Sequence, residues 1–228
     1  AISIFDDNYV FEKDELEAEN VQFIQSLQPT KVIALGHNYK DLVGHKEVYP
    51  EPVIFFKPPS AVIGNNEFIE IKENKKVWIE VELAIVIKKE CKKISVEDAK
   101  DYILGVTVAN DVTMQNVENR DHHLARSKGW DTFCPLGNII NTDVDTSALK
   151  MTSKINGNLT QNSTTANRIL NDFESVSFVS QFFTLQPGDV IITGTPANAE
   201  NSLVKDGDLV ELEIENIGTL SNPVKAPF

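Results

Sequence analysis

Cysteines, basic residues and long hydrophobic runs are all scarce in this sequence. Its 228 residues include two cysteines, Cys91 and Cys134, which are not spaced as a metal-binding pair and are expected to be reduced thiols. No apolar stretch approaches the ~20 residues of a membrane-spanning helix, and the N-terminus has no signal-peptide pattern. We therefore expect a cytoplasmic protein that has no membrane partner.

The shortage of basic residues gives the chain a strongly negative charge. There are 21 lysines and arginines against 34 acidic residues, and the formal net charge is -13. Such a charge argues against binding to nucleic acids or to an anionic membrane surface. An anionic small-molecule substrate would need a local positive centre, such as a metal ion or a few lysines.

Strand-like segments are abundant, and they favour a strand-rich α+β fold with few helices. We expect a short N-terminal extension over residues 1–30, with a helix possible at 12–27, and a single catalytic domain over residues 31–228. Strands are expected at residues 30–36, 52–58, 77–89, 104–111 and 208–218. Helices are expected at residues 95–103 and 169–183, and a long polar loop at residues 37–51. Because the helices do not alternate regularly with the strands, a doubly wound sheet is disfavoured.

Two acids share one face of the apolar segment at residues 77–89. Side chains two residues apart in a strand point to the same face, so Glu80 and Glu82 are neighbours. The strand could be half-exposed, with its acids facing water. Alternatively, the two carboxylates could hold a hard divalent cation, which prefers oxygen ligands. Trp78 and Ala84 on the same face favour a covered surface, and a metal site would need a third acid.

Asp111 can supply that third acid. It follows a buried strand-like segment and ends the pair Asn110-Asp111. Such a pair at a strand end could also form an ordinary turn, in which the side chains bind the backbone. Because clustered carboxylates repel one another, we expect the change Asp111→Asn to cost little stability in the metal-free protein.

Four motifs together resemble the fumarylacetoacetate hydrolase superfamily. They are IEVELAIVI, GVTVANDVT, RSKGWDTFCPLG and LQPGDVIITGTP, and the resemblance spans residues 31–223. It implies a mixed β-sandwich roll and a homodimer. It also implies that Glu80, Glu82 and Asp111 bind Mg²⁺, or alternatively Mn²⁺ or Ca²⁺.

The resemblance gives two further residues a role at the substrate. Lys128 matches the active-site lysine of the family, although a lysine is more usually a solvated surface residue. Thr195 matches a loop that binds the substrate carboxylate, although Gly194 and Pro196 are sufficient for a simple turn there. Other members of these motifs, namely Asp131, Phe133 and Cys134, are expected to be structural.

The loop after the first strand departs from the family pattern. Leu42 stands where many relatives have a histidine that activates water together with a glutamate. His45 and Glu47 could form a displaced catalytic dyad on a lid, or His45 could be an ordinary loop histidine. Asp41 is a further candidate near the metal. The chain also has Gln115 in place of a common arginine, and it lacks the glycine usual after Pro196.

The family resemblance implies a metal-dependent enzyme that acts on a 2-oxo acid. A divalent ion would bind the substrate through its carboxylate and 2-oxo oxygens and stabilise an enolate. The reaction expected is C–C bond hydrolysis of an acylpyruvate or decarboxylation of an oxaloacetate-like diacid. Isomerisation of a 2-hydroxydienoate is an alternative, and so is a non-catalytic metal-binding module that has kept the fold.

Overall fold

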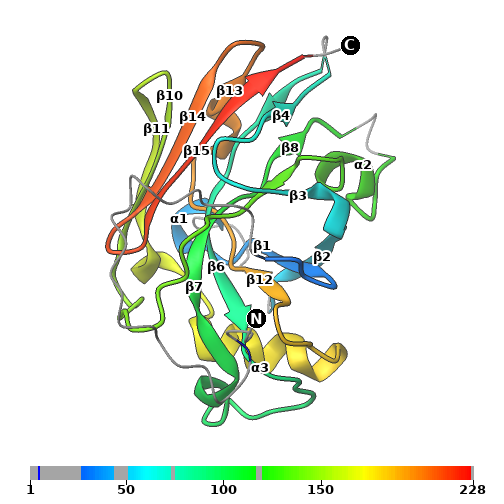
Figure 1. Ribbon diagram of the computed structural model, residues 1–228, viewed down its shortest axis with the longest axis vertical. Helices are drawn as coiled ribbons and strands as arrows, with labels where there is room; N and C mark the ends of the chain where they lie inside the picture. Colours follow the sequence, from blue (N-terminus) through cyan, green and yellow to red (C-terminus); the bar gives the residue numbers. More distant parts are fainter. Residues whose placement is uncertain (1–4, 6–26, 44–50, 73–74, 117–119, 227–228) are drawn as a thin grey trace, which may run out of the picture.

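The computed structural model describes residue 5 and residues 27–43, 51–72, 75–116 and 120–226. All but the last residue of the helix possible at 12–27 therefore lie outside the described residues, and so do the candidate residues His45 and Glu47. Two five-stranded sheets dominate the described part, which confirms the expected strand-rich class (Figure 1). No helix within the described residues has both the length and the apolar character needed to span a lipid bilayer.

The first sheet is mixed and carries the long buried strands. Its order is β2 (Val53–Lys57), β1 (Val32–Gly36), β12 (Val190–Ile192), β6 (Val81–Ile87) and β7 (Ile103–Asn110). Strands β1 and β12 run parallel, and the other neighbours run antiparallel. The strands expected at 30–36, 52–58 and 104–111 correspond to β1, β2 and β7.

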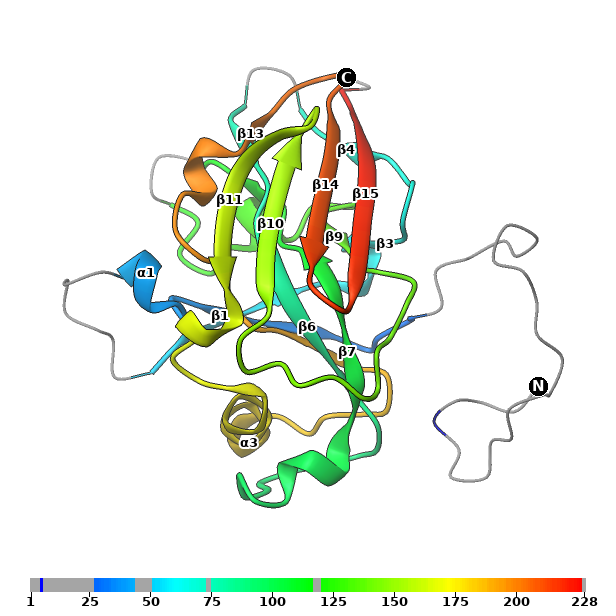
Figure 2. The same ribbon diagram turned by 90° about the vertical axis from the view of Figure 1, so that its left-hand side faces the viewer.

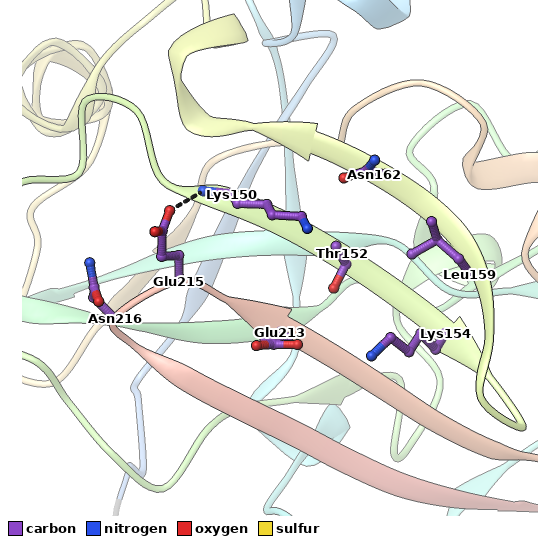
Figure 3. A pocket seen from close by; sticks show the side chains of 8 residues that line it. All are labelled: Lys150, Thr152, Lys154, Leu159, Asn162, Glu213, Glu215 and Asn216. Carbon is purple, nitrogen blue, oxygen red and sulfur yellow. Dashed lines mark hydrogen bonds between the residues drawn. The ribbon is translucent and has the colours of Figure 1, made fainter.

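The second sheet packs over β6 and β7, as Figure 2 shows. Its order is β11 (Asn158–Thr164), β10 (Lys150–Ile155), β14 (Leu209–Ile214), β15 (Gly218–Lys225) and β4 (Ile69–Glu70). The segment expected as one strand at 208–218 is instead β14 and the turn into β15, because Asn216 has a left-handed φ of 61° there. The outer face of this sheet is polar and holds a hollow of about 550 Å³, lined mainly by lysine, glutamate and amide side chains (Figure 3).

Two smaller groups of strands and three short helices complete the described structure. The strands are β13 (Leu203–Val204), β5 (Val77–Trp78) and β8 (Thr113–Met114) in one sheet, and β3 (Val62–Ile63) and β9 (Cys134–Pro135) in a pair. The helices are α1 (Lys40–Val43), α2 (Ala125–Lys128) and α3 (Asp172–Phe182). Single 3-10 turns are η2 (Pro59–Ala61), η3 (Ala99–Tyr102), η4 (Thr165–Asn167) and η5 (Ala199–Asn201).

The two helix predictions had different outcomes. The helix expected at 169–183 is α3, which begins after Asn171 because the Asn171 and Glu174 side chains form a reciprocal capping box. The helix expected at 95–103 is wrong, since only the turn η3 forms there. Ser95 and Asp98 make hydrogen bonds like those of a helix N-cap, but Val96 is exposed and the segment buries too little apolar surface to extend into a helix.

Strand β6 is buried on both faces and separates two hydrophobic cores. Its odd-numbered residues, such as Leu83 and Ile85, join the larger core between the two five-stranded sheets. Its even-numbered residues Ala84 and Val86 join a second cluster on the other side of the first sheet. The second face is therefore also covered, and the acids at the start of β6 lie on that face.

Candidate active site

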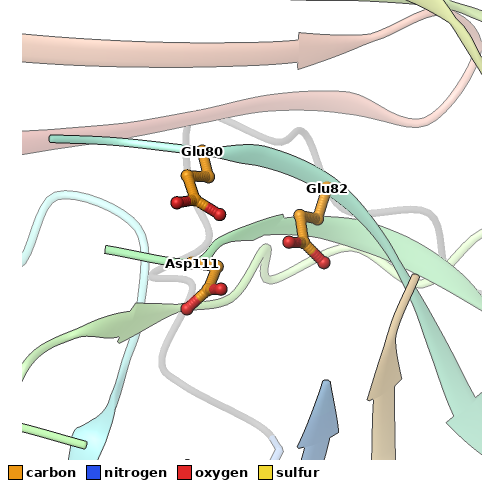
Figure 4. A group of neighbouring side chains, drawn as sticks. All are labelled: Glu80, Glu82 and Asp111. Atoms are coloured by element: carbon orange, nitrogen blue, oxygen red, sulfur yellow. The ribbon is translucent and has the colours of Figure 1, made fainter. Parts of the chain in front are cut away.

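Glu80, Glu82 and Asp111 meet where β6 and β7 lie side by side. In this antiparallel pair Val81 lies opposite Asn110, so the start of β6 adjoins the end of β7. The backbone N–H of Asp111 donates a hydrogen bond of 3.0 Å to the carbonyl oxygen of Glu80. One oxygen from each of the three carboxylates lies within 4.8 Å of the other two (Figure 4). The expected convergence is therefore found, while the role of these side chains as metal ligands stays a prediction.

The acid face of β6 does not meet water. Glu80 is 8% exposed, Glu82 is 2% exposed and Asp111 is fully buried. The alternative of a half-exposed strand with solvated acids is therefore wrong. Buried carboxylates need compensating partners, because desolvation and mutual repulsion both disfavour their charged forms.

A break in the strand positions Glu80. The segment expected as one strand at 77–89 divides into β5 and β6, because each piece joins a different sheet. In the gap, the N–H of Glu80 donates to the Asn110 side chain at 3.2 Å, and at the first residue of β6 the N–H of Val81 donates to the Gln161 side chain at 3.2 Å. The hydroxyl of Thr195 donates to the Val81 carbonyl at 3.2 Å. Side chains thus replace the missing strand partners and hold the backbone of the ligand candidates.

Two buried lysines neutralise part of the cluster. The Lys128 ammonium donates to Asp111 Oδ2 at 2.6 Å and to Glu80 Oε2 at 3.0 Å. The Lys57 ammonium donates to Asp111 Oδ1 at 2.5 Å and to the carbonyl of Val112 at 3.2 Å. The sequence interpretation placed Lys128 at the site but missed Lys57, which is fully buried. The signal was available, because a lysine that shares the inward face of an apolar strand with Phe55 needs a carboxylate partner.

The surroundings shift the pKa values of Glu82 and Asp111 in opposite directions. Burial, followed by the charges of Asp111 and Glu80, raises the pKa of Glu82 well above its usual value. Burial also acts to raise the pKa of Asp111, but the charges and hydrogen bonds of Lys128 and Lys57 hold it below its usual value. Burial acts to lower the pKa of Lys128, yet Asp111 and Glu80 raise it above its usual value. Glu82 is therefore the carboxylate that most lacks a positive neighbour.

The donor set fits a hard divalent cation. With all groups ionised, the three carboxylates and two ammonium groups carry a net charge of -1, which a divalent ion would convert to +1. One oxygen of Glu82 accepts from the N–H of Gly194 at 2.7 Å, and one oxygen of Glu80 accepts from Trp78 Nε1 at 2.8 Å and Thr113 Oγ1 at 2.9 Å. Because each carboxylate has about four lone-pair sites, acceptor capacity remains for an ion. Oxygen-only ligands suit Mg²⁺, Mn²⁺ or Ca²⁺.

The raised pKa of Glu82 leads to a testable expectation for the metal-free protein. A carboxylate whose pKa is raised by folding contributes stability below its usual pKa, and this stability is lost as the pH rises through the folded-state value. Glutamine cannot ionise, so Glu82→Gln is expected to be more stable than the wild type at pH 8 in EDTA and similar to it at pH 4. Urea unfolding at both pH values measures this difference.

The exposed Glu213 on β14 offers a matched control, because the same carboxylate-to-amide change there should leave the pH dependence unaltered. A Glu82→Gln protein less stable than the wild type at pH 8 would contradict the assigned environment.

A pocket of about 250 Å³ opens onto the acids. It is lined by the three carboxylates together with Gly36, His37, Leu42, Val53, Phe55, Trp78, Leu124, Lys128, Thr195, Ala199 and Glu200. Within the described residues, the three acids form the one group of three or more side chains that could hold a metal ion, and the larger hollow on the second sheet is not lined by any of them.

The remaining candidate residues divide between the pocket and the surface. Thr195 lines the pocket, and its hydroxyl also accepts from the Gln161 side chain at 3.1 Å. It therefore both faces the pocket and helps to hold the surrounding backbone. Asp41 is exposed and accepts from Ser163 and Asn167, and it is not among the lining residues. Leu42, which occupies the place of the family histidine, contributes apolar surface to the pocket.

Residues expected to be structural lie near the site without lining it. Cys134 is fully buried, and burial raises the pKa of its thiol to about 12, so it is poorly suited to act as a nucleophile. Phe133 is buried and stacks on Trp130, with ring centroids 6.2 Å apart. Asp131 is exposed. Gln115, which stands in place of a common arginine, is also exposed, and its backbone N–H donates to the carbonyl of Lys76.

Comparison with known proteins gives consistent matches. A family model described as fumarylacetoacetate (FAA) hydrolase C-terminal matches residues 31–225. The mitochondrial oxaloacetate tautomerase fahd2 of Xenopus laevis is 37% identical, over 92% of this chain and 70% of that protein. A crystal structure of 2-hydroxyhepta-2,4-diene-1,7-dioate isomerase from Mycobacterium marinum has a TM-score of 0.81 and 41% identity, over 88% of this chain and 76% of that one. A crystal structure of maleylpyruvate hydrolase from Sphingobium sp. SYK-6, in complex with manganese(II) and pyruvate, has a TM-score of 0.75 and 32% identity, over 87% of this chain and 71% of that one.

Proposed function

Since this chain belongs to the fumarylacetoacetate hydrolase family, we propose that it is a divalent-metal-dependent enzyme that acts on a 2-oxo acid. The observation that carries the proposal is the buried group of Glu80, Glu82 and Asp111, which opens onto a pocket of about 250 Å³. Relatives named as hydrolase, isomerase and tautomerase support catalysis in general. The manganese and pyruvate in the hydrolase structure support the metal and the substrate class.

The charge of the site favours an anionic substrate. When bound, the ion supplies Lewis-acid stabilisation of negative charge that develops on the substrate oxygens. The described carboxylates and lysines would leave a net charge of +1 once the ion is present, and one substrate carboxylate would neutralise it. Lys128 would help to orient that anion, because its ammonium lies at the pocket between Glu80 and Asp111. Phe55, Trp78 and Leu124 would exclude water from the bound substrate.

The overall reaction we propose is hydrolysis of a C–C bond in an acylpyruvate or decarboxylation of an oxaloacetate-like diacid. Both reactions pass through an enolate of the 2-oxo acid, which the positive site would stabilise. The decisive experiment measures turnover of acetylpyruvate and oxaloacetate with Mg²⁺ or Mn²⁺ and, separately, with excess EDTA. We expect turnover of at least one substrate that EDTA abolishes and added metal restores. Metal binding without turnover of any 2-oxo acid would indicate the non-catalytic module instead.

A second candidate is tautomerisation or isomerisation of an enol-forming 2-oxo acid. It is favoured by Leu42, which fills with apolar surface the place where many relatives carry a water-activating histidine. Moving a proton between carbon and oxygen requires no activated water, whereas C–C hydrolysis does. Following the enol absorbance of oxaloacetate alongside pyruvate release separates the two candidates, because a tautomerase changes the first without the second.

A further inference from the structure

Proton transfer at the substrate carbon needs a group that the carboxylate–lysine cluster does not supply. Lys128 donates to two of the acids, and all three acids are the ion's candidate ligands. Among the described lining residues of the pocket, the titratable side chains outside that cluster are His37 and Glu200. Both are exposed, so they stand where the pocket meets solvent.

The backbone presents His37 in an uncommon conformation. It directly follows the last residue of β1 and has a φ of 62°, in the left-handed region that non-glycine residues adopt at an energetic cost. Backbone conformations of this kind persist only where the surroundings impose them, and they cluster at functional sites. The conformation therefore implies that neighbouring residues hold the backbone of His37 in place.

The neighbouring residue fixes this turn to the loop that holds Glu82. The Asn38 side chain donates to the carbonyl of Thr193 at 2.8 Å and accepts from the N–H of Leu170 at 2.8 Å. The next residue in that loop, Gly194, donates its N–H to Glu82. A Cβ at Gly194 would lie 2.8 Å from the carbonyl oxygen of Leu35 and 3.1 Å from the Cβ of Asn38, so the two segments are in close contact. His37 is thus carried by a turn that packs directly against the loop whose Gly194 N–H binds Glu82.

We propose that His37 is a catalytic residue that exchanges a proton with C3 of the bound 2-oxo acid. The inference rests on the proposed function, because it requires the substrate's oxygens to face the carboxylate cluster. In the forward step the C3–H bond breaks and its electron pair forms the C2–C3 double bond. The negative charge moves to the C2 oxygen, and the proton passes to an imidazole nitrogen of His37. The reverse step returns the proton to C3.

Histidine suits this role better than the glutamate at the same rim. An imidazole both accepts and gives up protons near neutral pH, which a general acid–base catalyst must do in one cycle. An ordinary carboxyl group is almost entirely ionised at that pH, so it rarely holds a proton that it could return to carbon. The assignment uses His37 alone, and it does not depend on His45 or Glu47.

The test follows deuterium incorporation at C3 of pyruvate in D₂O by proton NMR with Mg²⁺ present. Asparagine at position 37 is the chosen variant, because it tolerates a left-handed φ and cannot act as a base. We expect His37→Asn to slow incorporation by about 10²- to 10⁴-fold. Calorimetry with Mg²⁺ and with oxalate should give wild-type affinities, which shows that the site remains folded. The matched control is His122→Asn, an exposed histidine that is not among the lining residues, and it should exchange at the wild-type rate.

Each contrary result has a separate meaning. Deuterium incorporation at the wild-type rate in His37→Asn overturns the assignment. It is also overturned if Glu200→Gln loses incorporation while His37→Asn keeps it. A wild-type protein that binds Mg²⁺ and oxalate but exchanges no deuterium also overturns it, while leaving the metal and substrate class intact. Failure of the wild type to bind Mg²⁺ and oxalate at all would instead refute the proposed function.

Discussion

Replacing Asp111 with asparagine is expected to remove divalent-metal binding and, with it, catalytic activity. The carboxylate is one of the three candidate ligands, and the substitution keeps its shape while removing its charge. Loss of a residue that only supports a metal ligand typically weakens binding about 10- to 100-fold, so loss of a ligand charge should weaken it at least as much. Calorimetric titration with Mn²⁺ measures the change directly.

The same substitution is also expected to destabilise the metal-free protein, contrary to the expectation from the sequence. Repulsion among three acids suggested that neutralising Asp111 would cost little, but this carboxylate is the counterion of both buried lysines. An asparagine would offer one oxygen to two ammonium groups and would turn its own NH₂ toward one of them. Breaking a buried ion pair by removal of one partner costs about 3–5 kcal/mol.

The pH dependence and a matched variant make this result specific. Because folding lowers the pKa of Asp111, the stability it contributes is present above its usual pKa and is lost as the pH falls through the folded-state value. The deficit of Asp111→Asn should therefore be large at pH 8 and shrink in acid. Glu82→Gln makes the same chemical change and should also weaken metal binding, yet it should not destabilise the apoprotein. Equal stability of Asp111→Asn and the wild type at pH 8 would show that the lysines are neutralised in another way.

The second large effect is expected from Lys57→Met in the absence of metal. Lys57 is fully buried, and methionine replaces its chain with an apolar one of similar length, so the main loss is the charge opposite Asp111. Lys128 remains as a partner of Asp111, so we expect a loss at the lower end of the range, about 3 kcal/mol. Added Mn²⁺ should recover part of this loss, because the ion brings positive charge to the same carboxylates. Urea unfolding in EDTA and in Mn²⁺ provides both values.

An exposed ion pair gives the control for Lys57→Met. Lys225 and Glu70 lie 2.9 Å apart with about two-fifths of each side chain exposed. Pairs of this kind contribute about 0–1 kcal/mol, so Lys225→Met should change the stability little. A loss from Lys57→Met no larger than that of Lys225→Met would mean that the buried ammonium does not stabilise the acid cluster.

The placement of the acids was predictable to different degrees. Side-chain direction along a strand depends only on odd or even position, so Glu80 and Glu82 could be assigned to one face from the sequence. Their approach to Asp111 depends on which strands pair, and the family resemblance supplied that information. The break between β5 and β6 was not predictable, because it depends on the two pieces joining different sheets and on Asn110, Gln161 and Thr195, whose side chains bind the backbone there from distant parts of the chain.

Lys57 and the segment at 95–103 show why local patterns have limits. The position of Lys57 on the same strand face as Phe55 indicates burial, but the carboxylate that neutralises it lies 54 residues further along the chain. At 95–103 the Ser95 hydroxyl accepts from the Asp98 N–H, as an N-cap would, but the helical turn begins only after Asp98, and a local bond cannot sustain a helix that has no apolar face to bury. Charge compensation and packing both depend on residues that are distant in the sequence, so neither can be predicted from local sequence patterns alone.

The burial of β6 between two cores has a consequence for how the site loses its shape. Amide groups of a strand that is packed on both faces exchange with solvent only when large parts of the fold open together. Glu82 belongs to this strand and Glu80 adjoins it, so the carboxylates are attached to the part of the chain expected to open last. Heating should therefore keep these two carboxylates in place until the fold opens as a whole, so their arrangement should last as long as the native state itself.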